Sequence, residues 1–496
     1  MSLSIYINSG KYNLSTQVNL VAGFINPSPN TYNHRMEIEV TYNKTNYLGI
    51  SSPNSKTITF IQQVDDDGEC TFDISPIYQS IVTPMIMSAS PSNVQGTYTP
   101  ITKDSIHNLP IKEGTATKIL SWGILEQRGS QTFRGNANYL TCRFYEMFST
   151  TPSGSPVRDP SSVIEKNIYM MWGRANESDP IEINFDEYKL NGITKKFLSS
   201  NYNIVDGESH INIGKDELHT IAFLTKSAIN TTAGVKFIQV EYFDSSSSSL
   251  GTTQIWNRNL SGGSDNPDPH HEDLKNEGFF LYCGIGLKNL DEIDLSEGSY
   301  SGVLPSGVSG GIDNIKYYKV TMTDPTFPQP AITSMTYVFN VVDYCDRYNT
   351  SRLSYMNRFG AWEYITLNKG KESEIKVKKE YINKPLLSDV GGTQFQGGIY
   401  TDISYPKNVA KQGQMASSVA TTETFTLSTG YLKPYEINQI QDMMMSPQIH
   451  ILDGEEAKAL ILETSTMKLK GDKNTGLYKY DLEFKYASPK YRTTYS

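Results

Sequence analysis

The stretch Tyr337–Leu367, YVFNVVDYCDRYNTSRLSYMNRFGAWEYITL, decides the fold that this sequence predicts. Three short runs in it have the alternation of a half-buried strand, in which successive side chains point to opposite faces of a sheet: Tyr337–Val342, Arg352–Asn357 and Trp362–Leu367. Turn-forming residues separate the runs, at Asp346–Thr350 and at Arg358–Gly360. The stretch therefore predicts a β-meander.

Length and composition are those of a folded β-protein with more than one domain. The chain has 496 residues, enough for roughly two to four domains with large cores. Tyrosine is abundant at 32 residues, charged residues make up only 20% of the chain, and helical periodicity is scarce. The formal net charge of −9 argues against a nucleic-acid-binding surface, because contacts with phosphates need a basic one. We predict no direct nucleic-acid binding.

The cysteines and the N-terminal segment indicate a protein made in a reducing cytoplasm. Cys70, Cys142, Cys283 and Cys345 lie far apart, and no CxxC pair occurs, so we interpret them as free buried thiols. The first residues, MSLSIYINSG, lack the basic and apolar regions of a secretory signal. No apolar run approaches the roughly 18 residues of a membrane helix, so we expect no membrane association.

Residues 1–150 are predicted to form an N-terminal β-sandwich. Candidate strands with turn residues between them are Gln17–Phe24, Arg35–Tyr42, Lys56–Gln62, Glu69–Ile74, Lys118–Ile124 and Tyr139–Met147. Asp67-Gly68 predicts a hairpin turn, and Ser75 is expected to be the N-cap of a short helix. Asp65–Asp67 followed by a glycine superficially suggests a calcium loop. The alternating acidic positions and the final glutamate of such a loop are missing, so a solvated turn is favoured.

Residues 160–328, after a loop rich in serine and proline, are predicted to form a jelly-roll-like sandwich. Ser245–Ser249 is expected to lie in a hairpin turn. The loop at residues 261–276 contains residues with metal-ligand chemistry: Asp268, His270, His271, Glu272 and Asp273. Adjacent histidines in an extended loop point in different directions, and no second pair has a ligand spacing. We favour an exposed loop; a metal site and a glycan contact stay open. The candidate strands here are Glu165–Trp172, Thr220–Thr225, Val235–Phe243, Gly278–Leu287 and Ile315–Met322.

Residues 333–496, after a proline-rich linker, are predicted to form a C-terminal β-rich assembly domain. Glu374–Tyr381 reads as a strand with lysines on its outer face, which suits an edge strand or one that faces a partner. A helix is expected from Pro434 to Pro447, with Lys433 at the N-cap and an apolar face of Ile437, Ile440 and Met444. Further candidate strands are Thr424–Leu427, Gln448–Leu452, Ala459–Glu463, Ser465–Leu469 and Leu477–Tyr486. The predicted fold class is mainly β: multi-domain antiparallel β-sandwiches, Ig-like or jelly-roll-like, with a C-terminal β domain that carries one short helix.

Catalytic motifs are missing from the sequence. It contains no GxSxG elbow, HExxH helix or Walker loop, so we predict no enzyme, no catalytic or metal-binding residues and no cofactor. A polysaccharide depolymerase stays open, because two carboxylates suffice for that chemistry. Several charged residues lie in the stretch Tyr337–Leu367: Asp343, Asp346, Arg347, Arg352 and Arg358. We interpret them as turn and surface residues that offer Arg/Asp pairs to a neighbouring subunit.

Four segments resemble virion tail proteins of phages that infect Bacteroidota, the crAss-like podoviruses included. The pattern RLxYxNRxGxWxYxxL begins at Arg352, and the order of turn glycine, strand, Phe-Asp-Ile-Ser-Pro and helix begins at Gly68. The pair YFDSSSSSLGTTQ and GIGLKNL is similar to the middle domain of that group. The closing segment FTLSTGYLKPYEINQIQDMMMSPQIHIL, with the later KYDLEFKYAS, is similar to its last domain.

The resemblance implies a structural subunit of a bacteriophage virion, located in the tail and made in the cytoplasm of the bacterial host. Such a subunit is part of a ring or collar, packs against copies of itself in a cyclic homo-oligomer, and contacts other tail or portal-proximal virion proteins. A surface rich in Tyr, Asn and Ser suits large polar interfaces between subunits. A receptor- or glycan-binding tail adhesin, with residues 160–328 as the binder, is the alternative.

Overall fold

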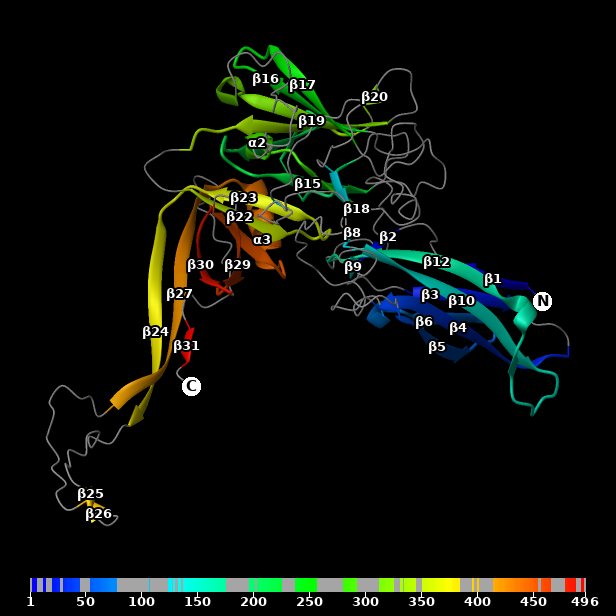
Figure 1. Cartoon of the computed structure of the whole chain (residues 1–496). Coiled ribbons are helices and arrows are strands. Elements are labelled where there is room, and N and C mark those ends of the chain that lie inside the picture. The colour runs from blue at the N-terminus through cyan, green and yellow to red at the C-terminus, as the bar shows by residue number, and fades with distance from the viewer. Residues whose placement is uncertain are drawn as a thin grey trace.

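The computed structural model describes residues 2–6, 12–14, 20–26, 30–44, 54–77, 107, 124–126, 128–129, 133–134, 137–174, 196–200, 203–224, 237–256, 280–291, 312–324, 331–332, 334–344, 350–383, 395–396, 399–400, 414–453, 456–464, 478–487 and 492–494. In these residues the predicted fold class is confirmed. The chain is mainly β, with several mostly antiparallel sheets and few helices (Figure 1).

A two-sheet sandwich contains the N-terminal strands. The larger sheet has the order β2-β12-β10-β4-β5, with β11 on β10: β2 (Tyr12–Leu14), β4 (Tyr32–Lys44), β5 (Asn54–Gln63), β10 (Ala137–Ser149), β11 (Val157–Arg158) and β12 (Ile164–Met171). The smaller sheet has the order β1-β3-β6: β1 (Ser2–Tyr6), β3 (Leu20–Asn26) and β6 (Glu69–Asp73). Alternating apolar residues of both sheets share one core, for example Ile25, Ile38, Phe72 and Phe144. The strands thus bury one face each, as their pattern predicts.

The predicted Asp67-Gly68 hairpin is wrong in one respect, because the strands on its two sides belong to different sheets. The turn itself is present. The Asp65 carboxylate accepts hydrogen bonds from the backbone N–H groups of Asp67 (3.1 Å) and Glu69 (2.7 Å), and Gly68 has a φ of +85°. The turn therefore joins the two sheets of the sandwich. Residues 75–77 after it are helical.

The middle of the chain forms a second pair of sheets. The larger has the order β13-β14-β21-β19-β16-β17, with β20 on β19: β13 (Ile204–Val205), β14 (Glu208–Ile213), β16 (Phe237–Phe243), β17 (Ser249–Trp256), β19 (Tyr317–Asp324), β20 (Ala331–Ile332) and β21 (Tyr337–Val341). The smaller has the order β15-β18-β7: β7 (Ile124–Glu126), β15 (Thr220–Leu224) and β18 (Phe280–Gly284). The predicted serine-rich hairpin is confirmed between β16 and β17, where the Asp244 carboxylate accepts from the N–H groups of Ser246 and Ser248.

The C-terminal strands form one large sheet. Its order is β23-β22-β28-β29-β30-β27-β24, with β31 on β27: β22 (Ser351–Met356), β23 (Trp362–Leu367), β24 (Lys371–Asn383), β27 (Gln414–Leu432), β28 (Ile449–Asp453), β29 (Glu456–Leu462), β30 (Tyr478–Tyr486) and β31 (Arg492–Thr494). The predicted helix is confirmed as α3 (Pro434–Met444), which packs Ile437, Ile440 and Met443 into the core of this sheet. Lys433 is its N-cap, and the Glu436 carboxylate accepts from the Lys433 N–H at 2.7 Å.

The remaining elements are short. They are η2 (Pro160–Ser162), α2 (Leu287–Asp291), η5 (Ile312–Asn314) and the strand pairs β8 (Arg128–Gly129) with β9 (Phe133–Arg134) and β25 (Phe395–Gln396) with β26 (Ile399–Tyr400). The predicted strand Leu477–Tyr486 is confirmed as β30, in which Leu482 and Phe484 are buried and Asp481 and Glu483 are exposed.

The predicted three-strand meander is wrong. Strand β21 lies between β14 and β19 in the middle sheet, whereas β22 and β23 pair with each other and β22 continues to β28 in the C-terminal sheet. Between β21 and β22 the chain therefore passes from one sheet to the other. The stretch Tyr337–Leu367 therefore links two sheets.

The sheets cross the predicted boundaries of the units at 1–150, 160–328 and 333–496. Strand β12 was expected in the second unit but pairs with β10 in the first sandwich. Strand β21 was expected in the third unit but pairs parallel with β14 of the second. Strand β7 of the first unit pairs with β18. Whether three units fold independently stays a prediction.

Several sequence expectations lie outside the described residues: the loop at residues 261–276, Cys345, Asp346, Arg347 and the strand at residues 465–469. Cys70, Cys142 and Cys283 are free and buried, as expected. Burial raises the pKa of the Cys70 and Cys142 thiols to about 12. None of the helices in the described part of the chain combines the length and apolar character needed to cross a membrane.

Candidate functional site

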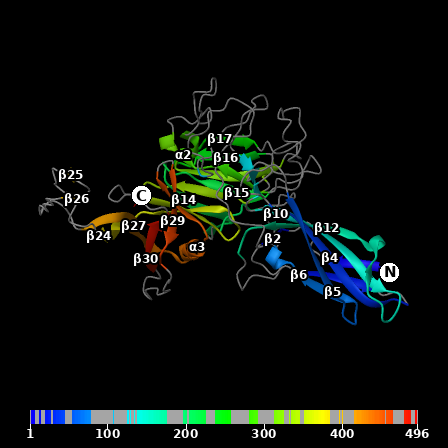
Figure 2. The same cartoon turned by 60° about the horizontal axis from the view of Figure 1, so that its bottom comes forward.

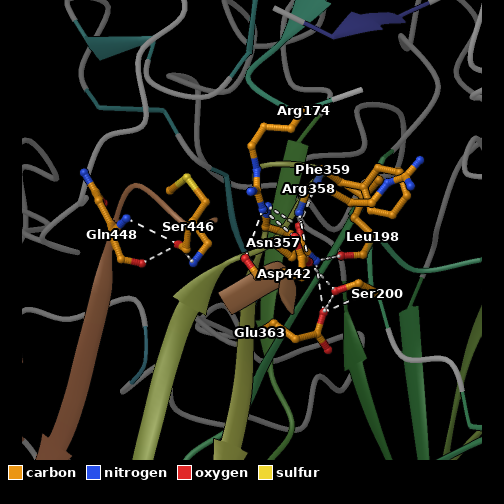
Figure 3. A network of polar contacts seen from close by, with 12 residues as sticks. Arg174, Leu198, Ser200, Asn357, Arg358, Phe359, Glu363, Asp442, Ser446 and Gln448 are labelled. Carbon is orange, nitrogen blue, oxygen red and sulfur yellow. Dashed lines mark hydrogen bonds and ion pairs between the residues drawn. The ribbon is translucent and has the colours of Figure 1, made fainter. Parts of the chain in front are cut away.

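The β22–β23 hairpin lies where the three parts of the chain meet. Its residues are buried almost throughout, and they contact segments from the N-terminal, middle and C-terminal strands. We call this region the junction: the hairpin 351–367 with Arg174, residues 197–200, residues 217–219, His107, Asp442 and His450. Figure 3 shows its polar network from close by.

The tight turn of the hairpin is held by one side chain. The Asn357 Oδ1 accepts from the N–H groups of Phe359 and Ala361, each at 3.0 Å, and the Asn357 amide donates to the Leu198 carbonyl at 2.9 Å. Gly360 in this turn has a φ of +77°, which residues with a Cβ rarely adopt. A Cβ at Gly360 would lie 2.4 Å from the carbonyl oxygen of Trp172, so the backbone that follows β12 approaches the turn too closely for any other residue.

Two buried carboxylates lie on either side of Ser200. Glu363 of β23 accepts from the Ser200 N–H at 2.9 Å and from the Asn357 amide at 3.0 Å, and Asp442 of α3 accepts from the Ser200 hydroxyl at 2.9 Å. Arg174, which follows β12, forms an ion pair with Asp442 (Figure 3). Burial raises the pKa of both carboxyl groups, and Arg174 partly offsets this for Asp442. The network connects four chain segments through hydrogen bonds to charged groups, which are the stronger kind.

A buried ion pair connects the hairpin to the middle sheets. Arg352 on β22 lies 3.1 Å from the Glu217 carboxylate, and its guanidinium donates to Thr366 at 2.8 Å and to the His219 Nδ1 at 3.0 Å. The side chains of Arg352 and Glu217 are only 7% and 9% exposed. The expectation that Arg352 is a surface residue is therefore wrong. Its long side chain reaches across to the preceding unit, which strand alternation does not reveal.

Three histidines from distant parts of the sequence meet in the same region. The His107 Nδ1 lies 2.8 Å from the Tyr364 hydroxyl, and its Nε2 lies 3.2 Å from the His450 Nδ1. The His450 ring stacks on Trp362, and the His219 ring lies against Tyr364. Burial lowers the pKa of His107 and His219 well below the usual value, and that of His450 to about 4. All three are neutral at pH 7.

We expect the free energy of unfolding to fall as the pH falls from 6.5 toward 4. Between the ordinary histidine pKa of 6.5 and the folded pKa of about 4, the unfolded chain binds a proton that folded His450 does not. His450 alone then contributes a loss of about 3 kcal/mol by pH 4. Glu363 and Asp442 act in the opposite sense, because their raised pKa values favour folding as they become protonated.

Urea unfolding at several pH values between 7 and 4 measures this effect. His450→Gln keeps a polar side chain but removes the titrating group, so the variant should lose less stability on acidification than the parent chain. Parallel pH profiles for the two proteins would show that His450 is not the group responsible.

The junction holds segments together and offers little for catalysis. Ser200 is 4% exposed, so a substrate does not reach its hydroxyl in this conformation. In the described ranges no group of three or more His, Cys, Asp or Glu side chains is arranged to hold a metal ion. What the arrangement can do is fix the relative positions of the sheets, because Arg174, Arg352 and Glu363 each contact a polar group on a different segment of the chain.

A second feature lies on the outside of the molecule. Strands β24 and β27 extend away from the body as a long two-stranded ribbon (Figures 1 and 2). We call this ribbon, residues 371–383 with 414–424, the arm. Every side chain described from residue 371 to 382 is exposed, including Ile375 (56%), Val377 (52%) and Tyr381 (60%). The predicted edge strand is confirmed, because β24 ends the order of its sheet.

Sequence reasoning placed few of these residues correctly. Of the charged residues that it singled out, Asp343 is exposed, whereas Arg352 and Arg358 belong to the junction. The residues it missed are Glu217, His219, Asp442, His450 and Ser200. No motif in the sequence marks these residues. The one feature that could have indicated a buried polar site is Glu363, which lies between Trp362 and Tyr364 in an otherwise apolar strand. Comparison with known proteins adds no identification, since no protein-family model and no curated protein matches the chain.

Proposed function

We propose that the chain is a structural subunit of a bacteriophage virion and forms part of a ring or collar in the tail through packing between subunits. The observation that carries the proposal is the arm. An exposed two-stranded ribbon with uncovered apolar side chains is an aggregation risk in a free monomer and a contact element in an assembly. The resemblance of the hairpin motif to phage tail proteins points to the same role.

The exposed apolar side chains of Ile375 and Val377 share one face of the arm. On β24, Ile375 and Val377 lie on the same side as Ser373, whose cross-strand neighbour Phe425 is buried in the C-terminal core. The face that is covered by the core near the body thus continues, uncovered, along the arm. Burial of apolar surface on this face by a neighbouring subunit contributes about 25 cal/mol per Å².

The junction suits the same role. A contact made by the arm of a ring subunit fixes the position of the rest of its body only if the sheets of that body do not move relative to one another. The ion pairs and hydrogen bonds of Arg174, Arg352, Glu363 and Asp442 provide such connections among the described segments.

Imaging of the native particle and mass measurement in solution test the proposal. We expect rotationally related copies in the tail, each with its arm against the next subunit. A chain variant with Ile375→Ser and Val377→Ser should fold normally but be incorporated poorly into particles. Ile461→Ser, which alters an apolar residue 43% exposed on β29, is the matched control. A chain absent from purified virions would overturn the proposal.

The adhesin alternative finds no specific support in the described residues. The exposed tyrosines there are Tyr32, Tyr381 and Tyr431, and none of them belongs to residues 160–328. A glycan array with the full chain tests it directly, since saturable binding lost on substitution within residues 160–328 would favour the adhesin.

A further inference from the structure

The outer edge of β24 is an unpaired strand edge in the described structure. Strand β24 pairs with β27 on one side and ends the order of the sheet on the other. An edge of this length presents a row of backbone N–H and C=O groups to any chain with a complementary strand.

The charges on one face of β24 are arranged symmetrically. Glu372 and Glu374 precede Ile375 at alternate positions, and Lys376 and Lys378 follow it at alternate positions. All four charged side chains therefore lie on the same face of the ribbon, opposite the apolar face. The residues one position and three positions from Ile375 on its two sides carry opposite charges.

This symmetry makes the edge complementary to itself. If two β24 strands pair antiparallel with Ile375 opposite Ile375, Glu374 lies opposite Lys376 of the second copy and Glu372 opposite Lys378 of the second copy. A two-fold axis repeats both contacts, so four opposite-charge pairs form, and the apolar faces of both copies lie on the same side. Within one chain, Glu374 and Lys376 lie 3.6 Å apart, but both are largely exposed, so this pair competes weakly.

The charges also select this register among its neighbours. A shift of the two-fold axis by one residue toward the tip places Lys376 against Lys376 and Glu372 against Glu380. A shift by one residue toward the body places Glu374 against Glu374. In the Ile375-centred register the like-charged contact is Lys371 with Lys379, which the two-fold axis repeats, so two such contacts stand against four opposite-charge pairs. The Lys371 ammonium lies 4.3 Å from the centre of the Phe425 ring, so it is directed toward its own sheet.

Space is available for a second copy. The rest of the sheet and the other large sheets lie on the β27 side of β24, and the short β25–β26 pair lies beyond the tip of the arm (Figure 1). A two-fold rotation about the outer edge of β24 therefore places the two bodies on opposite sides of the paired strands.

We propose that the free subunit forms a two-fold dimer in which two β24 strands pair antiparallel about Ile375, with a second copy of this chain as the partner. The pairing covers the strand edge and joins the two arms into one four-stranded sheet. An isologous contact of this kind closes as a pair and does not make a ring. The dimer contact is therefore separate from the contacts of the proposed tail ring. An experiment can disprove the dimer without disproving the ring, and the reverse also holds.

Sedimentation of the full chain over a range of concentrations tests the dimer. We expect a species of twice the 55.6 kDa monomer mass, with an affinity that weakens as salt rises, because exposed charge pairs are screened. Glu374→Lys and Lys376→Glu should each raise the dissociation constant at least about tenfold, since each creates two like-charged contacts. The double variant E374K/K376E exchanges the charges and should restore the dissociation constant to near the parent value.

Matched controls change the same charges on another strand of the same sheet. Glu483→Lys and Lys479→Glu on β30 are exposed and should leave the dimer unchanged. A chain that is monomeric at all concentrations would overturn the proposal, as would single variants without effect. Two other results would also overturn it and would point to a different edge as the partner. The first is a double variant whose dissociation constant stays as high as that of the single variants, and the second is the formation of open-ended oligomers in place of a dimer.

Discussion

Gly360→Ala is expected to lower the free energy of unfolding by about 3–5 kcal/mol, one of the largest effects of any single substitution in this chain. Two independent costs add. A φ of +77° costs an L-residue about 1–2 kcal/mol. The new Cβ would also lie 2.4 Å from the Trp172 carbonyl oxygen, which cannot retreat easily, because the adjacent Arg174 N–H donates to the Arg358 carbonyl at 2.8 Å.

Two other glycines separate these costs. Gly207 has a φ of +80°, and a Cβ added there would have no other atom within 4 Å, so Gly207→Ala should show the backbone cost alone. Gly370 has open space around it and no positive φ, so Gly370→Ala should be close to neutral. Equilibrium urea unfolding of the three variants measures the differences. A Gly360→Ala loss no greater than that of Gly207→Ala would show that the contact with Trp172 is not close in solution.

Arg352→Met is the second substitution for which we expect a large effect, a loss of about 3–5 kcal/mol. Methionine keeps much of the apolar stem but leaves the Glu217 carboxylate buried without its cation. Most of the loss comes from that unpaired charge, not from the attraction between the two groups. The double variant R352M/E217Q should recover a substantial part of the stability, which a double-mutant cycle measures.

An exposed ion pair is the control. Arg143 and Glu165 lie 2.8 Å apart on neighbouring strands with half of each side chain exposed, so Arg143→Met should cost far less stability than Arg352→Met. If Arg352→Met behaves like Arg143→Met, the Arg352–Glu217 pair is hydrated in solution and the junction is looser than described.

Local patterns predicted the strands well. Alternation over five to nine residues located β21, β22, β23 and β30 with boundaries close to those observed, because the two-residue period depends only on which residues are apolar. Helix α3 was equally clear, since Pro434 and Pro447 mark its ends and its apolar residues recur at helical spacing. Met444, which was expected on the apolar face, is half-buried, whereas the neighbouring Met443 is fully buried and Met445 is exposed.

The pairing of those strands was harder to predict. Turn residues after Val342 suggested that the chain folds back on the same sheet, yet β21 and β22 belong to different sheets. A turn signal marks the end of a strand without specifying the neighbour of the next one. For the same reason β12 was assigned to the second unit, because a serine- and proline-rich loop precedes it, although it pairs with β10 of the first.

The sequence alone thus determined the class of this protein, most of its strands, the helix α3 and the edge character of β24, because each of these depends on residues close together in the chain. The tertiary structure decided which residues of the hairpin are functional candidates. Arg352 was interpreted as a turn or surface residue, yet it is buried, as are Asn357, Gly360 and Glu363. Their neighbours Glu217, Leu198, Trp172 and Ser200 come from segments that only the folded chain brings together. A polar side chain is stable inside a protein only when such partners surround it, and no local pattern encodes them.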